Sequence, residues 1–177
     1  MSRELIGIIK ADTERLLYNV EVTLKTCDLN VVLCKLPVWK HTYHMLHSLD
    51  QWFINPRKYR EPDFHSPGLN SLNQADENAL SQEDLLNYFY TVKQKILTYL
   101  DSLTDEQLSE NPEDCEFTRL TLILGGFRHA STHLGNINGT TIIETGGWPR
   151  CIGIEREMCG DVDDDLWEYE PERATQL

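Results

Sequence analysis

The stretch Phe127-Arg128-His129-Ala130-Ser131-Thr132-His133-Leu134-Gly135-Asn136 is the starting point for interpreting this chain. It has the pattern of a helix and carries two histidines four residues apart. Residues at this spacing lie one above the other on a single helix face, so both imidazoles can reach one metal ion. A third ligand from another helix would complete a site with open coordination positions. The stretch therefore predicts a helical fold built around a metal centre.

Length and composition indicate an ordinary globular protein. The chain has 177 residues, of which 40% are hydrophobic and 25% charged, which suits one domain with a substantial core. Its formal net charge is −13, and such a chain repels phosphate backbones. We therefore expect no nucleic acid partner. No apolar run is long enough to cross a membrane, so we also expect no membrane partner.

The cysteine pattern predicts a reducing compartment. The five cysteines are odd in number, and none of them form a Cys-x-x-Cys pair. They are Cys27, Cys34, Cys115, Cys151 and Cys159. Charged residues near the N-terminus lie within an amphipathic pattern and do not resemble a secretion signal. We expect reduced thiols in a cytoplasmic protein.

Apolar residues recur at helical spacing in four segments, which predicts four helices. These segments are about 2–26, 37–53, 81–103, and 116–137 or slightly beyond. Proline favours the first position of a helix, and Ser81 followed by acidic residues is a good helix start. Residues 25–36 are expected to form a loop or a short helical turn.

The expected fold class is all-α, an antiparallel four-helix bundle. A long connection rich in Pro, Asn, Asp, Ser and Gly, residues 55–80, would join the second and third helices. We place the bundle at residues 1–147. Residues 148–177 would form an acidic C-terminal extension that packs on the bundle or trails from it.

Two adjacent glycines precede the histidine pair and lie on the same predicted helix face. A glycine inside a helix costs about 1 kcal/mol relative to alanine, so Gly125 and Gly126 need a reason. One interpretation is that they leave room for a substrate beside a metal. The other is that they allow close helix packing. The pattern does not decide between the two.

The second predicted helix offers three candidates for a third ligand: His41, His44 and His47. Residues three apart drift by about 60° around a helix, so the three form a slanting stripe and cannot all face one point. His41 lies furthest round and is the poorest candidate. His44 and His47 fall on the same side, and periodicity does not choose between them. Asp50, one turn from His47, would either orient an imidazole or be a partly exposed acid.

Three further residues have two interpretations each. His65, in the long connection, is expected at the surface, with a minority interpretation that its loop covers the mouth of a cavity. Tyr43 and Arg128 are candidates for substrate contact, although packing and surface roles respectively explain them more simply.

Two segments carry a resemblance to a known family. Trp39 to Phe53, with His47-Ser48-Leu49-Asp50 eight residues after the tryptophan, resembles the second helix of the DinB-like (DinB/YfiT-like) metalloenzyme family. His129 to Ile137 resembles its fourth helix, although Leu134-Gly135-Asn136 stands where Arg-Gly-Gln is common. The resemblance covers about residues 2–145, and the acidic C-terminal extension lies outside it.

This resemblance implies a four-helix bundle of up-down-down-up topology and a divalent metal, which we expect to be zinc or nickel. Carried over position by position, the implied metal ligands are His47, His129 and His133, with His44 as the rival to His47. No fourth protein ligand is evident, which predicts an open site.

The implied function is that of a metal-dependent enzyme acting on a small-molecule substrate. Some relatives are transferases or isomerases that use a low-molecular-weight thiol, and hydrolysis by a metal-activated water would suit the same site. The alternative is a helical bundle that binds a metal or ligand without turnover. Burial of both sides of the second and fourth helices, one against hydrophobic neighbours or a second protomer and the other lining a polar cavity, suggests a homodimer.

Overall fold

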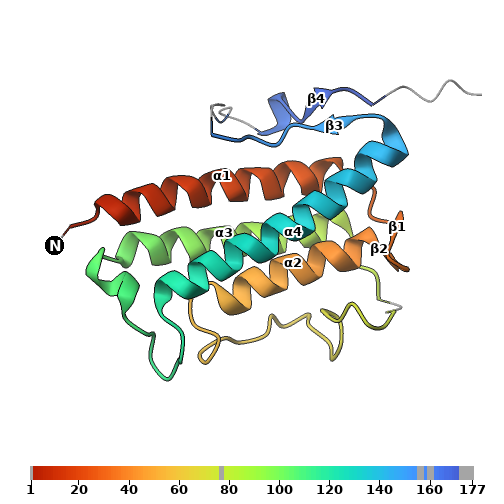
Figure 1. Ribbon diagram of the computed structural model, residues 1–177. Helices are drawn as coiled ribbons and strands as arrows, with labels where there is room; N and C mark the ends of the chain where they lie inside the picture. Colours follow the sequence, from red (N-terminus) through yellow and green to blue (C-terminus); the bar gives the residue numbers. More distant parts are fainter. Residues whose placement is uncertain (1, 76–77, 155–157, 159–161, 172–177) are drawn as a thin grey trace, which may run out of the picture.

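A computed structural model describes residues 2–75, 78–154, 158 and 162–171. The chain is mostly helical (Figure 1). Its four α-helices are α1 (Glu4–Thr26), α2 (Val38–Trp52), α3 (Gln82–Ser102) and α4 (Arg119–Thr145). They match the four predicted segments, with α4 reaching several residues beyond Ile137.

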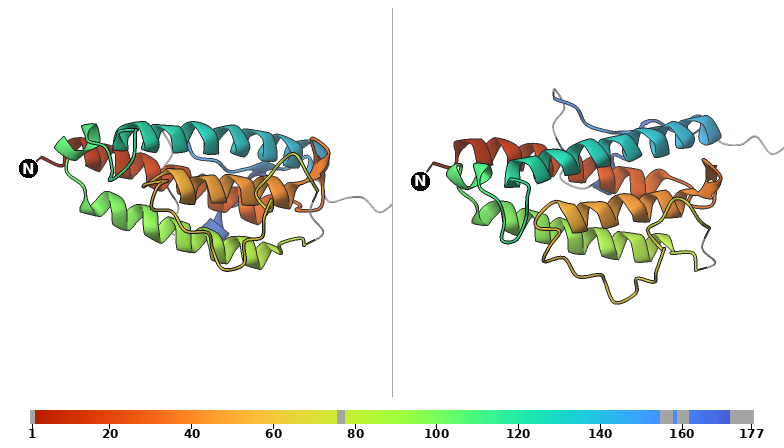
Figure 2. Two further views of the ribbon diagram at one scale, coloured as in Figure 1. Left: turned by 90° about the horizontal axis from the view of Figure 1, so that it is seen from below. Right: turned by 60° about the horizontal axis from the view of Figure 1, so that its bottom comes forward.

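The four helices lie alongside one another, which is consistent with a helical bundle. Helix α2 packs against α4 and α3, and α1 packs against the same two helices. Followed by colour in Figure 1, α1 and α4 run in one direction, whereas α2 and α3 run in the other. The residues connecting α2 to α3 must therefore return along the length of the molecule. In Figure 2 this connection runs lengthwise over α2, where it can contribute side chains to that helix.

Local signals explain where helices α3 and α4 begin and where α4 ends. Ser81 caps α3 in a complete capping box: its hydroxyl accepts from the Asp84 amide, and the Asp84 carboxylate accepts from the Ser81 amide. Thr118 caps α4 through the amide of Thr121. Gly146 ends α4 in the left-handed conformation, with φ of 69°, which glycine adopts without steric cost.

Two short antiparallel sheets lie at the ends of helices. Strand β1 (Val32–Leu33) pairs with β2 (Leu36–Pro37), and Cys34 and Lys35 turn between them with positive φ. The expectation of a loop or helical turn over residues 25–36 was therefore wrong for this hairpin. Strand β3 (Trp148–Pro149) pairs with β4 (Trp167–Tyr169). Two short 3-10 helices complete the elements, η1 (Glu106–Ser109) and η2 (Val162–Asp164).

The core lies between the helices. The apolar side of α2 faces inward, with Met45, Leu49 and Phe53 all buried, whereas Trp52 is 44% exposed. Described parts of the C-terminal extension pack on the bundle, because Ile152 and Val162 form a small cluster with residues of α1. None of the helices within the described ranges has the length and apolar character needed to span a membrane.

Candidate metal centre

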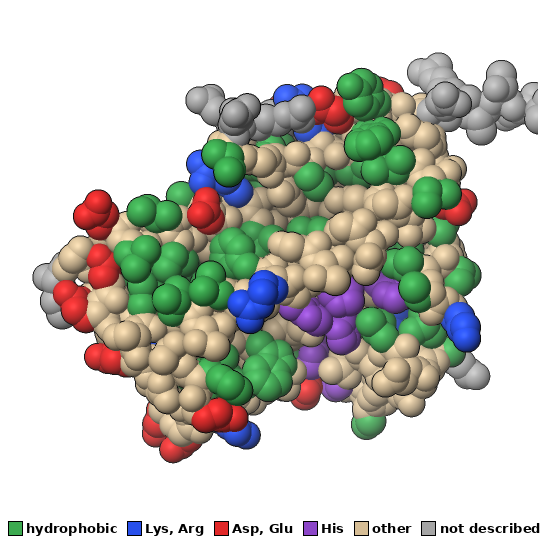
Figure 3. All heavy atoms as spheres, viewed as in Figure 1, with side chains coloured by type: hydrophobic (Ala, Val, Ile, Leu, Met, Phe, Trp, Pro, Cys, Tyr) green, Lys and Arg blue, Asp and Glu red, His purple; other side chains and the backbone are tan. Residues whose placement is uncertain are grey.

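Three histidines from two helices meet where α2 packs against α4. The ring centroid of His44 lies 4.9 Å from that of His133 and 5.1 Å from that of His129, and the α4 pair are 4.6 Å apart. One nitrogen from each ring lies within 4.8 Å of the others. Figure 3 shows histidine side chains gathered on one face of the molecule, in the seam between α4 and α2. The group is of a kind that can bind a metal ion.

The structure joins His44, and not His47, to the α4 pair. His47 lies three residues further along α2, which turns its side chain about 60° around the helix axis. At this rotation His47 is 1% exposed and contacts residues of the connection between α2 and α3 instead. The implied set His47, His129 and His133 is therefore not brought together, and the rival His44 takes the place of His47.

Hydrogen bonds distinguish the ring nitrogens of this group. His44 Nδ1 lies 2.7 Å from the backbone carbonyl of Asn70. A carbonyl oxygen only accepts, so Nδ1 carries the proton and the neutral ring keeps its lone pair on Nε2. His129 Nε2 and His133 Nδ1 are buried and have no hydrogen-bond partner among the residues that the structure describes. Buried polar atoms are rarely left unpaired, so these two nitrogens are free to bind a metal ion or a water molecule.

The environment keeps the α4 imidazoles neutral. Burial is the main cause that lowers the pKa of His129, and the neighbouring His44 lowers it further. The same causes, with the charge of His129 added, lower the pKa of His133 to about 4. Both rings are therefore unprotonated at neutral pH, which is the form that binds metals.

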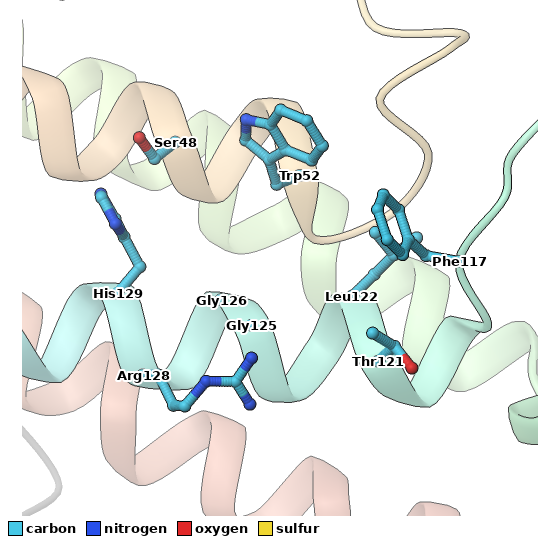
Figure 4. A pocket seen from close by; sticks show the side chains of 9 residues that line it. All are labelled: Ser48, Trp52, Phe117, Thr121, Leu122, Gly125, Gly126, Arg128 and His129. Atoms are coloured by element: carbon cyan, nitrogen blue, oxygen red, sulfur yellow. The ribbon is translucent and has the colours of Figure 1, made fainter.

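A cavity of about 330 Å³ lies directly beside His129. Figure 4 shows His129 projecting from α4 toward Ser48 of α2, with Trp52 on α2 beside them. The complete lining is Ser48, Trp52, Phe117, Thr121, Leu122, Gly125, Gly126, Arg128 and His129. Most of this lining is apolar, which suits a ligand with an apolar body.

The two glycines of α4 have different surroundings. A Cβ atom at Gly126 would lie 2.9 Å from the ring of Phe53, so this glycine permits close packing of α2 on α4. At Gly125 the nearest atom to an added Cβ is an Arg128 nitrogen 3.9 Å away, which leaves space. Both glycines also border the cavity. Packing explains Gly126, and the open space beside Gly125 supports the ligand interpretation for that position.

A second polar group lies about 60° around α2 from His44. His47 Nε2 is 2.7 Å from Glu61 Oε2, and His65 Nδ1 is 3.6 Å from the same oxygen. Asn70 Nδ2 lies 3.3 Å from His47 Nδ1, and the Tyr59 hydroxyl donates to Glu61. Burial raises the pKa of Glu61, but the hydrogen bonds from His47 and Tyr59 outweigh it and lower the pKa overall.

The remaining candidates have structural partners. Asp50 accepts hydrogen bonds from Tyr88 and Lys95 and does not orient an imidazole through a hydrogen bond in the described part of the chain. Tyr43 is fully buried, with its hydroxyl 2.8 Å from His65 Nδ1, so it does not line the cavity. His41 bonds to the carbonyl of Leu33.

The expectations for His65 and Arg128 have different outcomes. The surface position expected for His65 was wrong, because its side chain is only 11% exposed. Arg128 is exposed and lines the cavity, so its suggested place near a substrate remains open.

Sequence reasoning missed Glu61 and Asn70. Both lie in the irregular connection between α2 and α3, where no periodic pattern shows which side chains point toward a helix. The one signal was its unusual length, which is common in functional loops. The chain matches no family model, no curated protein and no solved structure.

Proposed function

We propose that the protein binds a divalent metal ion through His44, His129 and His133 and acts as a metal-dependent enzyme. The observation that carries this proposal is the convergence of buried, unpartnered imidazole nitrogens from α4 with an oriented His44. Metal-ligating histidines commonly donate their second ring nitrogen to a carbonyl, as His44 does to Asn70. Imidazole ligands favour zinc or nickel.

The family assignment is part of this proposal. Four helices with the α1/α4 and α2/α3 pairs running in opposite directions support a DinB-like bundle. A histidine from α2 beside a His-x-x-x-His pair on α4 also supports it. The contributing histidine stands three residues before the position that the family motif implied. We therefore infer DinB-like architecture with His44 as the ligand from α2.

An open site beside a cavity suits catalysis on a small molecule. When bound, the metal would stabilise a thiolate or lower the pKa of a water molecule, as thiol transfer or hydrolysis respectively requires. The protein would bind the apolar part of the substrate against Trp52, Phe117 and Leu122. Arg128 at the same cavity would attract an anionic group. In the described residues its guanidinium has no acidic partner that would compete for such a group.

Metal content tests the site. We expect the purified protein to hold about one ion of zinc or nickel at the three-histidine site, and His44→Ala and His133→Ala to remove it. His47→Ala is the matched control, because it removes a buried histidine of the same helix while leaving the three-histidine group intact. Elemental analysis that finds the ion retained in His44→Ala but lost in His47→Ala would overturn the ligand assignment.

Turnover is tested separately. We expect the metal-loaded protein to accelerate the reaction of a low-molecular-weight thiol with an electrophile, or the hydrolysis of a small ester or amide, and His133→Ala to abolish that rate. A metal-loaded protein that is inactive in both screens would favour the alternative, a non-catalytic metal-binding bundle.

A homodimer is also proposed. Several large apolar side chains outside the cavity are exposed on the single chain, among them Ile8, Leu124 and Ile143. Exposed apolar side chains are compatible with a partner surface, although single ones are normal on monomers. Sedimentation velocity at micromolar concentration should find twice the chain mass, and a monomer there would contradict the proposal.

A further inference from the structure

We infer that His47, Glu61 and His65 form a second metal site, distinct from the three-histidine group. One ligand atom from each residue lies within 4.8 Å of the others. Two imidazoles and one carboxylate, with the remaining positions open, are the ligand set that proteins use for iron(II), and manganese(II) accepts similar ligands. The proposed occupant is therefore an iron(II)- or manganese(II)-like divalent cation, a different preference from that of three imidazoles.

The separations between the atoms are compatible with one ion. Ligand atoms that each lie about 2.1 Å from an ion can be at most about 4.2 Å apart. Glu61 Oε2 lies 2.7 Å from His47 Nε2 and 3.6 Å from His65 Nδ1, so both separations are below that limit. The two rings are also close, with centroids 5.1 Å apart.

The surroundings hold the ligands in place. The His47 ring contacts Tyr43 and Tyr59, with centroids 5.7 Å and 5.5 Å away, and its second nitrogen contacts the Asn70 amide. The Tyr59 hydroxyl donates to Glu61. Ligands that are ordered in this way before binding lose less entropy when the ion enters. Glu61 has a 47% exposed side chain, which gives the ion a route from solvent.

Metal binding needs a proton shift within His47, a turn of the Asn70 amide and displacement of the Tyr43 hydroxyl from His65. Without metal, Nε2–H donates to Glu61 and Nδ1 accepts from Asn70 Nδ2. With metal on Nε2, the proton would reside on Nδ1 and would donate to Asn70 Oδ1 once the amide turns over. The His47 ring stays neutral, and Glu61 and Asn70 remain its neighbours. At His65 the ion would displace the Tyr43 hydroxyl from Nδ1.

The competing explanation is that the group only holds the connection onto α2 by hydrogen bonds. The two explanations differ in what they predict for Mn²⁺. A His129→Ala/His133→Ala variant lacks the first site, so titration of Mn²⁺ followed by electron paramagnetic resonance reports the second site alone. We expect one bound Mn²⁺ per chain in this variant. Adding Glu61→Gln, which keeps the side-chain shape and removes the charge, should weaken binding by at least about tenfold.

A second measurement covers the case in which the double variant does not fold, as checked by circular dichroism. Wild-type protein preloaded with one equivalent of Zn²⁺ should still bind one Mn²⁺, and His65→Ala should lose it while keeping the Zn²⁺. The absence of Mn²⁺ binding in folded protein, or binding unchanged by both Glu61→Gln and His65→Ala, would overturn the second site. Neither result would bear on the three-histidine site, whose metal content is measured independently.

Discussion

The two histidine groups to which α2 contributes differ in the hydrogen bonds that their ring nitrogens make. Within the described part of the chain, His129 and His133 present buried nitrogens without a partner, and no carboxylate belongs to their group. His47 has a hydrogen-bond partner on both nitrogens, one of them the carboxylate of Glu61. The first group is built where two helices pack, and the second where one helix meets an irregular connection. The contrast teaches that helix packing brings the first group together and loop contacts bring the second together, while Asn70 of the connection contacts both.

The largest expected effect comes from breaking the contact between α2 and α4. Phe53 is fully buried against Gly126, and Phe53→Ala should lower the free energy of unfolding by about 3–5 kcal/mol. Urea denaturation measures the loss. Trp52→Ala is the control, because Trp52 is adjacent but 44% exposed and should cost clearly less. Equal losses from the two variants would contradict the described packing.

The next largest expected effect is the pH dependence of stability in the metal-free protein, which reports on His133. Burial is the main cause that lowers the pKa of His133 to about 4 in the folded protein, whereas the unfolded chain takes up this proton near its ordinary value of about 6.5. Between these values the unfolded state binds more protons, so stability falls as the pH falls from about 6.5 to about 4.

This loss should be on the order of 2 kcal/mol for His133, since the side chain is only partly buried. Urea titrations at pH 7 and pH 5 measure it in wild type and in His133→Asn. The asparagine variant should show a smaller difference between the two pH values. An unchanged difference would show that His133 does not carry this effect.

The paired glycines provide a smaller test of the helix contact. Gly126→Ala would place a methyl group 2.9 Å from Phe53, and overpacking of about 1–3 kcal/mol should exceed the helix gain of about 1 kcal/mol. Gly125→Ala meets nothing closer than 3.9 Å and should stabilise the protein by up to about 1 kcal/mol. Thermal unfolding of both variants checks the opposite signs. Only Gly126→Ala should weaken metal binding at the three-histidine group.

The smallest expected effect concerns Asn70, which contacts both groups. Its backbone carbonyl accepts from His44, and its side chain contacts His47. Asn70→Ala removes only the side-chain contact, so we expect a loss of about 0.5–1 kcal/mol in unfolding free energy. Zinc content at the three-histidine group should stay unchanged. A loss of that zinc would show that the two groups are coupled through the loop.

Local sequence patterns were enough to predict the four helices and the histidine pair on α4. The start of α3 at Ser81 depends on residues within one helical turn, and the structure confirms it. The four-residue spacing of His129 and His133 likewise brings their rings together. The β1–β2 hairpin was not predicted, because a pair of two-residue strands is too short to show a periodic pattern.

The sequence by itself therefore determined the four helices and the histidine pair on α4, because helical geometry depends on near neighbours in the chain. Tertiary packing alone selected His44 over His47, because about 60° of rotation separates them and the contact of Phe53 with Gly126 helps to set how α2 faces α4. Packing also brought Glu61, His65 and Asn70 onto α2. Their positions follow from the path of an irregular connection, in which contacts between distant residues replace the periodic hydrogen bonds of a helix.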